Sequence, residues 1–297
     1  MSADRSVGVP ATHVWTSPDA PREQDRALVA DSPDVAGWCA VTGPAERLGL
    51  HGRTVTAAVL GEPVQVVEEQ GAWARVVLPW QPSSADPRGY PGWVPLAHLA
   101  EPGTATDAVA VVRPLIAMLR VRGGGLELSC GTVLPMVDRE RSEVVVALPD
   151  GDQGWLDAAD VVVRADAFSA ALAPASVVAT ARGFLGTHYL WGGTSGWGAD
   201  CSGLVHLAHR VHGVQTPRDA FDQHRAADPV PLDDVRAGDM LFFARPEAPA
   251  HHVGWATTDA SAGPLTMLHA PEEKVLVEET VLTGERLATL VGAGRCH

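Results

Sequence analysis

No run of lysine or arginine occurs in this chain of 297 residues, and its formal net charge is −14. Nucleic-acid binding requires a basic patch that neutralises phosphates, so no nucleic-acid partner is expected. No apolar segment approaches the roughly 18 residues of a membrane helix, and the N-terminal MSADRSVGVPATHVW lacks the basic and apolar regions of a signal peptide. We therefore expect a cytoplasmic protein without membrane contact, although a chain whose leader had been removed would begin in the same way.

Cysteine is also scarce, and its spacing argues against a metal-binding framework. The four residues Cys39, Cys130, Cys201 and Cys296 are widely separated and form no C-x-x-C pair, so a zinc ribbon is not expected. The composition is that of a globular protein, with 46% hydrophobic and 20% charged residues. The length allows two or three domains and a sizeable core.

A weak internal repeat runs through residues 55–165. The segments GYPGWVPLAHL (89–99) and GDQGWLDAADV (151–161) share the pattern G-x-x-G-W, and GEPVQVV (61–67) matches GTVLPMV (131–137). Short Val/Leu segments between Gly and Pro predict small antiparallel β units, including a hairpin that turns near Gln70–Gly71. The first copy carries an insert in PWQPSSADPRGYPG (79–92), which is rich in turn residues.

The Gly-Trp-Val segment before a short polar connection resembles bacterial SH3-like barrels, and we expect Trp73, Trp93 and Trp155 in the barrel cores. Residues 1–54 are rich in Pro and Asp, which predicts an extended arm on the first barrel with a short helix near 44–50. The predicted domains are the arm plus first barrel (1–103), the second barrel (104–165) and a third domain (166–297).

The third domain has a different pattern. An Ala-rich segment of helical spacing ends at Gly186, and a second helix with an apolar stripe ends at Gly213. Four strand-like segments follow, at 239–244, 251–258, 265–270 and 274–281. Helices followed by an antiparallel sheet predict an α+β fold.

Cys201 directly precedes the second predicted helix. The partial positive charge of a helix N-terminus stabilises a thiolate, so we expect a lowered thiol pKa and a nucleophile at this position. The alternative is a buried, inert cysteine. A cysteine nucleophile requires a histidine base, and His251, His252 and His269 lie on predicted strands. Because adjacent strand residues face opposite sides, only one of His251 and His252 can face the thiol.

Five motifs then occur in order across residues 189–270: YLWGG…DCSGLV, TPRDA, AGDMLFF, HHVGW and LHA. Together they resemble the NlpC superfamily of bacterial cell-wall cysteine peptidases, which have a minimal papain-like fold. The resemblance implies that Cys201 is the nucleophile, His252 rather than His251 the base, and His269 the residue that orients the base. It also implies that Tyr189 points its hydroxyl into the site, while the Cys201 N–H is the natural oxyanion donor.

A subgroup with two N-terminal SH3-like domains resembles this layout and cleaves murein peptides that begin with a free L-Ala, releasing L-Ala-γ-D-Glu. A desolvated ammonium must be paired with a carboxylate, and Asp219 matches the family position, although Ala220 follows it where relatives often have Ser. We expect Asp200 and Ser202 to hold substrate amide or carboxylate groups. The first barrel would contribute Glu62 and Tyr90.

The expected partner is thus a murein peptide, with no cofactor and no metal. We expect a monomer, since a closed site needs no second chain, and Trp191 and Trp197 are candidates for lining the cleft. Two alternatives remain at this stage. One is a secreted hydrolase that holds intact peptidoglycan through its SH3-like domains, and the other is a non-catalytic wall-binding protein.

Overall fold

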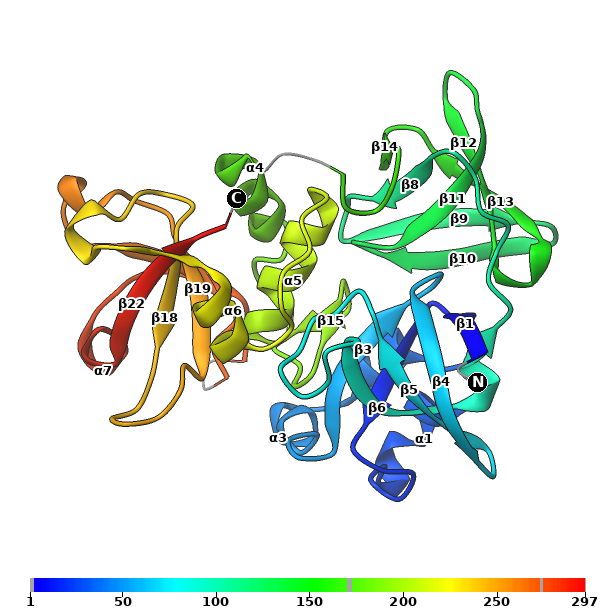
Figure 1. Ribbon diagram of the computed structural model, residues 1–297, viewed down its shortest axis with the longest axis horizontal. Coiled ribbons are helices and arrows are strands. Elements are labelled where there is room, and N and C mark those ends of the chain that lie inside the picture. The colour runs from blue at the N-terminus through cyan, green and yellow to red at the C-terminus, as the bar shows by residue number, and fades with distance from the viewer. Residues whose placement is uncertain (1–2, 170–172, 273–274, 297) are drawn as a thin grey trace.

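Two seven-stranded sheets and one six-stranded sheet are the main elements of the computed structural model, which describes residues 3–169, 173–272 and 275–296 (Figure 1). The first sheet contains β1 (Ala3–Val7), β2 (Ala11–Trp15), β3 (Thr54–Val59), β4 (Pro63–Gln70), β5 (Trp73–Leu78), β6 (Tyr90–Pro95) and β7 (Leu99–Ala100). The second contains β8 (Val109–Val112), β9 (Ile116–Val121), β10 (Gly124–Ser129), β11 (Val133–Arg139), β12 (Glu143–Ala147), β13 (Gln153–Asp157) and β14 (Val161–Arg164). We refer to residues 3–100 and 109–164 as the first and second β domains.

The two β domains have the same strand order. It is β3-β2-β6-β5-β4-β1-β7 in the first and β10-β9-β13-β12-β11-β8-β14 in the second. Each strand of one domain therefore has a counterpart in the other. The repeat begins at β1, well before residue 55.

The expectation of an extended arm is wrong for β1 and β2. β1 pairs with β4 and β7, and β2 pairs with β3 and β6. All five residues of β2 are buried, so the strand lacks the polar–apolar alternation that reveals a half-exposed strand. The connection from β2 to β3 also hides the repeat, because it spans residues 16–53 where the second domain has only residues 122–123 between β9 and β10.

This long β2–β3 connection contains three short helices, α1 (Arg26–Val29), α2 (Val35–Val41) and α3 (Pro44–Leu48). The third confirms the helix predicted near 44–50. The predicted hairpin is also confirmed, because β4 and β5 pair across Gly71, whose φ of 60° favours glycine. Short 3₁₀ helices lie at Glu23–Asp25, Leu96–His98, Pro149–Gly151, Leu232–Asp234 and Ala260–Ala262.

The three barrel tryptophans are not core residues. Trp73, Trp93 and Trp155 are each only half-buried, and the first two pack against the cluster that includes Trp38 of α2. Aliphatic side chains fill the two cores instead, among them Val14, Val64 and Val76 in the first domain and Leu119, Leu128 and Val144 in the second.

The remaining residues form the α+β unit predicted from the sequence. Its sheet has the order β17-β22-β18-β19-β20-β21, and every pairing is antiparallel. The strands are β17 (Asp228–Val230), β18 (Met240–Phe243), β19 (His252–Ala256), β20 (Thr266–His269), β21 (Glu278–Val281) and β22 (Leu290–Arg295), with a hairpin of β15 (Thr194–Ser195) and β16 (Gly198–Ala199). The helices are α4 (Pro174–Arg182), α5 (Cys201–Val211), α6 (Ala220–Ala226) and α7 (Gly284–Ala288).

Helix α5 lies at the centre of the molecule, between the six-stranded sheet and the two β domains (Figure 1). It packs against α4 and β19, and all of its residues are buried. The apolar side buries Leu204, Leu207 and Val211 in the domain core. The polar side of α5 contacts the β domains. For this reason α5 has no exposed face, although its sequence is amphipathic.

Both β domains contact this unit through specific polar groups. Arg164 at the end of β14 donates to the carbonyls of Arg210 and Val211 at the C-terminal end of α5. Ser129 of the second β domain accepts a hydrogen bond from the N–H of Gly196 at 2.8 Å. From the first β domain, the carbonyl of Ala57 accepts a hydrogen bond from Oγ1 of Thr194 in the β15–β16 hairpin at 2.5 Å. The β domains therefore act as supports for α5 and the β15–β16 hairpin.

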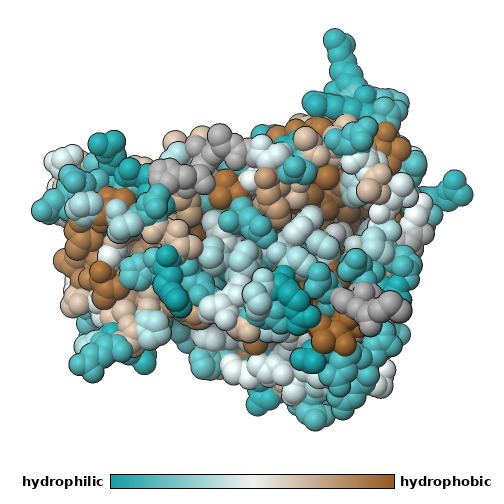
Figure 2. Space-filling view, in the orientation of Figure 1, coloured by the Kyte–Doolittle hydropathy of each residue, from teal (hydrophilic) through white to brown (hydrophobic). Residues whose placement is uncertain are grey.

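The visible surface is mainly hydrophilic over α5 and β15, whereas hydrophobic residues gather over the six-stranded sheet and over part of the second β domain (Figure 2). Leu287 and Val291 of this region are each 51% exposed. Among the described residues, no helix combines the length and apolar character required to cross a membrane.

Candidate active site

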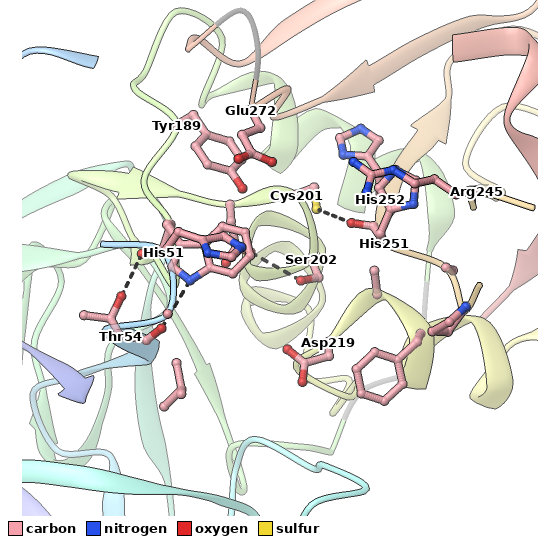
Figure 3. Close-up of a pocket in the computed structure, with 18 of the residues that line it drawn as sticks. His51, Thr54, Tyr189, Cys201, Ser202, Asp219, Arg245, His251, His252 and Glu272 are labelled. Atoms are coloured by element: carbon pink, nitrogen blue, oxygen red, sulfur yellow. Dashed lines mark hydrogen bonds between the residues drawn. The ribbon is translucent and has the colours of Figure 1, made fainter. Parts of the chain in front are cut away.

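Cys201 is the first residue of α5 and lines a cavity of about 570 Å³ (Figure 3). Asp200 caps the helix, because its Oδ1 accepts a hydrogen bond from the N–H of Gly203 at 2.7 Å. The Cys201 side chain is 7% exposed, and its Sγ lies 4.0 Å from the carbonyl oxygen of His251. The sequence pattern that predicted a thiol at a helix N-terminus in a cleft is therefore matched by the geometry.

Glycines on both sides of Cys201 allow the backbone to pack closely. A Cβ on Gly203 would lie 2.0 Å from the carbonyl oxygen of Gly193, and a Cβ on Gly193 would lie 2.6 Å from that of Gly198. Asp200 fixes the same stretch from the other side, since its Oδ2 accepts from the N–H of Gly192 at 2.9 Å. The stretch is a tightly packed support for the thiol.

Two histidines and a glutamate form a line that leads away from the cavity. Nε2 of His252 lies 2.7 Å from Nδ1 of His269, and Nε2 of His269 lies 3.5 Å from Oε1 of Glu278. The pairing of β20 with β21 places His269 opposite Glu278. His252 lines the cavity with Cys201. Glu278 was missed from the sequence, because only the strand register shows that it faces His269.

Burial changes the charge state expected for this site. Burial and the neighbouring Asp200 carboxylate raise the pKa of the Cys201 thiol to about 12. Burial, with a smaller effect of Arg286, lowers the pKa of His252 well below its ordinary value. The expectation that the helix N-terminus lowers the thiol pKa is wrong, because desolvation of the thiolate outweighs the helix field. The resting pair is a protonated thiol and a neutral imidazole.

Tyr189 lines the cavity on the side of Glu272 (Figure 3). Its backbone N–H donates to the carbonyl of Val275 at 2.7 Å, and its side chain is only 3% exposed. Burial, followed by the nearby Cys201, raises the pKa of the phenol. The hydroxyl therefore keeps its proton and can donate a hydrogen bond into the cavity.

Asp200 and Ser202 both line the cavity, but a buried arginine holds them in place. Arg218 donates from Nη2 to Oδ2 of Asp200 at 2.7 Å and from Nη1 to Oδ1 at 3.0 Å. Nη1 also lies 3.0 Å from Oγ of Ser202. Because both oxygens of Asp200 are already engaged, its main contribution is to position the thiol helix. Arg218 was missed, although it directly precedes Asp219 in the TPRDA motif.

Tyr90 and Asp219 come together from different domains. Oη of Tyr90, on β6 of the first β domain, donates to Oδ2 of Asp219 at 2.9 Å. Both residues line the cavity, as does Ala220. Burial is the main reason that the pKa of Asp219 is raised, with Arg218 and Tyr90 acting against it. A carboxylate that is costly to keep charged in this position is suited to pairing with a cation.

Glu62 does not face the cavity, so the expectation that it contacts substrate is wrong. Its side chain is fully buried, and its oxygens accept from Nη1 of Arg210 at 2.7 Å and Nη2 at 3.0 Å. Gln81 donates to the same carboxylate at 2.8 Å. The physical reason is that Arg210 lies on the buried polar side of α5, where a charge requires a partner.

The two candidate tryptophans have different positions. Trp191 lines the cavity; its Nε1 donates to the carbonyl of Thr54 at 3.2 Å, and its ring lies 4.0 Å from that of His51. Trp197 instead lines a separate groove between Pro10 and Leu126.

Several residues of the cavity wall had not been identified from the sequence. The β2–β3 connection and β3 supply Thr16, His51, Gly52, Thr54 and Val55, and the α+β unit supplies Arg245, Glu272 and Arg286. They lack a motif, and only the fold brings them to Cys201.

Comparison with known proteins agrees with this geometry. A gamma-D-glutamyl-L-lysine dipeptidyl-peptidase of Bacillus subtilis (strain 168) is 37% identical over 278 residues, which cover 91% of each chain. The chain belongs to the NlpC/P60 family. The profile of that family matches residues 186–289, and that of the YKFC SH3b2 domain matches residues 121–163.

Two further proteins match over more than nine tenths of this chain. A gamma-D-glutamyl-L-lysine dipeptidyl-peptidase of Bacillus cereus is 32% identical and covers 92% of this chain and 84% of its own. The crystal structure of an NlpC/P60 family protein from Bacillus cereus ATCC 10987 superimposes with a TM-score of 0.91, at 30% identity and 99% coverage of both chains. The predicted papain-like unit behind two SH3-like domains is confirmed. This NlpC/P60 protein is a cysteine peptidase of peptidoglycan.

Proposed function

We propose that this peptidase hydrolyses the γ-D-glutamyl–diamino acid bond of murein peptides that begin with a free L-Ala, and releases L-Ala-γ-D-Glu. The observation that carries the proposal is the contact between Tyr90 and Asp219. It places a carboxylate at the end of the cavity where the first β domain closes it. The two Bacillus relatives are named gamma-D-glutamyl-L-lysine dipeptidyl-peptidases, which supports cleavage after γ-D-glutamate and release of a dipeptide.

The charge states of the site define the first step. The Cys201 thiol attacks the γ-carbonyl carbon of D-Glu while its proton passes to the neutral imidazole of His252. Nε2–H of His252 donates to His269, which leaves Nδ1 of His252 to accept the thiol proton; the 2.7 Å contact between the rings holds this arrangement. His269 and Glu278 act as positioning residues for the base.

The oxyanion and the leaving group are then handled by the same few residues. In this mechanism the Cys201 N–H and the Tyr189 hydroxyl donate to the developing oxyanion. The C–N bond breaks as His252 returns the proton to the leaving amine of the diamino acid. A water molecule, deprotonated by His252, attacks the thioester, frees the dipeptide and restores the thiol.

The free-amine requirement follows from the closed end of the cavity. An L-Ala ammonium fits between the Asp219 carboxylate and the wall formed by Tyr90, and pairing with a cation offsets the cost of keeping Asp219 ionised. A lactyl group or a further residue on this nitrogen would remove the charge and would meet the first β domain. The enzyme should therefore cleave short peptides in preference to intact cell wall.

The support that the β domains give to α5 favours this role over wall attachment. Arg164, Ser129 and Glu62 of the β domains all have partners in the peptidase unit. A secreted hydrolase whose SH3-like domains hold peptidoglycan is the second candidate. We place the protein in the cytoplasm, where it would act in the recycling of wall peptides as a monomer.

The test is incubation of the reduced enzyme with L-Ala-γ-D-Glu-diaminopimelate, followed by mass detection of the dipeptide. Release of L-Ala-γ-D-Glu by the native chain, with none from Cys201→Ala, supports the proposal. Persistence of the intact tripeptide with native enzyme, or cleavage only of polymeric peptidoglycan, would reject it.

A further inference from the structure

The charged residues that line the cavity are divided between different sides of Cys201. Asp219 lies where the first β domain closes the cavity, and Glu272 lies beside Tyr189, whereas Arg245 lies on the side of His252 (Figure 3). Arg286 joins that cationic side from α7. A substrate bound across Cys201 therefore meets an anionic group at one end and guanidinium groups at the other.

Arg245 has the properties of a ligand-binding arginine. It lies two residues after the end of β18, and its side chain is exposed. Arg210 and Arg218, by contrast, are buried and each is engaged with a carboxylate. Among the described residues, no carboxylate forms an ion pair with Arg245.

Arg286 has a more restricted position next to the base. Its guanidinium carbon lies 5.6 Å from the centroid of the Phe243 ring, and that ring lies 5.6 Å from the ring of His252. It contributes to the low pKa of His252, after burial. The base returns its proton to the leaving amine, so the region around His252, Arg286 and Arg245 is the side that the leaving group occupies.

We propose that Arg245 binds a carboxylate of the leaving diamino acid and thereby selects substrates. This inference rests on the proposed function, which places the L-Ala-γ-D-Glu part between Cys201 and Asp219. Two carboxylates have the required chemistry: the α-carboxylate of a C-terminal diamino acid, and the side-chain carboxylate of diaminopimelate. A guanidinium binds either group through paired N–H donors.

Three tripeptides distinguish the sources of the carboxylate. L-Ala-γ-D-Glu-L-Lys offers only the α-carboxylate, its C-terminal amide offers neither, and the diaminopimelate tripeptide amidated at its α-carboxylate offers only the side-chain group. The kcat/KM of each is measured with native enzyme, Arg245→Gln, Arg245→Lys and the control Arg225→Gln. Arg225 is exposed on α6 and does not line the cavity.

Arg245→Gln should lower kcat/KM about fivefold on at least one of the two tripeptides that carry a carboxylate on the diamino acid, because an exposed ion pair contributes no more than this. On the amide of the Lys tripeptide, whose diamino acid has no carboxylate, the loss should be less than about twofold. Arg245→Lys should restore part of the loss, and Arg225→Gln should change none of the three. The substrate that responds identifies the carboxylate. An equal loss of kcat/KM on all three tripeptides, or no loss on any of them, would overturn this inference and leave the proposed function standing. If native enzyme cleaves none of them, the proposed function fails and this inference fails with it.

Discussion

Nη1 of Arg210 donates to Oε2 of Glu62 at 2.7 Å, and this ion pair joins the helix that carries Cys201 to the first β domain. The two side chains are 1% and 0% exposed. Nη2 of Arg210 also lies 2.8 Å from Nε2 of His206, whose Nδ1 lies 2.8 Å from the carbonyl oxygen of Thr216. Since Tyr90 belongs to the same β domain as Glu62, this pair helps to hold Tyr90 against Asp219.

Glu62→Gln should destabilise the protein by about 3 kcal/mol, because it leaves the charge of Arg210 buried without a countercharge. Urea unfolding measures the change. The control is Glu143→Gln, which removes the partly exposed partner of Arg120 and should cost less than about 1 kcal/mol. A Glu62→Gln variant with native stability and a raised KM would instead show that Glu62 binds substrate.

The raised thiol pKa predicts how Cys201 reacts with an alkylating agent. A thiol with a pKa of about 12 is almost fully protonated at neutral pH, and its thiolate fraction increases about tenfold per pH unit below that value. The rate of iodoacetamide modification of the Cys201 peptide, followed by mass spectrometry, should therefore still be rising at pH 9. A plateau reached by pH 7 would show a preformed thiolate and contradict this charge state.

The adjacent histidines provide a matched pair of variants. His252→Ala removes the group that accepts the thiol proton and should lower kcat by at least about a hundredfold. His251→Ala should have an effect below about fivefold on kcat, because the contact of His251 with Sγ of Cys201 is made by its backbone carbonyl. The reverse order of the two effects in steady-state kinetics would identify His251 as the base.

Buried histidines make stability depend on pH. Burial lowers the pKa of His13 and of His209 to about 4 each, from 6.5, so below pH 6.5 the unfolded chain binds more protons than the folded chain. The free energy of unfolding should therefore fall as pH decreases from 6.5, by up to about 2 kcal/mol per histidine at pH 5. Urea titrations at several pH values measure the free energy of unfolding. His209→Phe should reduce the slope of this free energy against pH by the equivalent of one proton. A free energy that stays constant from pH 7 to 5 would contradict the assignment.

The sequence was sufficient to predict those features that depend on residues close together in the chain. The apolar stripe of α5, the glycine turn after β4 and the ordered motifs around Cys201, His252 and His269 depend on neighbouring residues. Tyr90 was identified from the resemblance to relatives with two SH3-like domains, and the insert that it ends, which the second β domain lacks, supported the choice. Asp219 was identified from a motif, and only the fold shows that it contacts Tyr90.

The predictions that were wrong concern features that depend on residues far apart in the chain. Strand β2 is buried on both faces, so its sequence does not alternate between polar and apolar residues. Glu62 pairs with Arg210, which lies 148 positions away on α5. The thiol pKa depends on desolvation by the whole cavity wall, which a helix-terminus pattern does not report. Arg245 carries no motif and reaches the cavity because of the path of the chain after β18.

The measurement that tests the central claim most directly is the preference for a free N-terminal amine. The kcat/KM of L-Ala-γ-D-Glu-diaminopimelate is compared with that of its N-acetyl form, for native enzyme, Asp219→Asn and the exposed control Asp233→Asn. A charge-assisted contact of about 3 kcal/mol predicts a native preference of about a hundredfold, lost in Asp219→Asn and kept in Asp233→Asn. Equal cleavage of both peptides by native enzyme, or an unchanged preference in Asp219→Asn, would contradict the account.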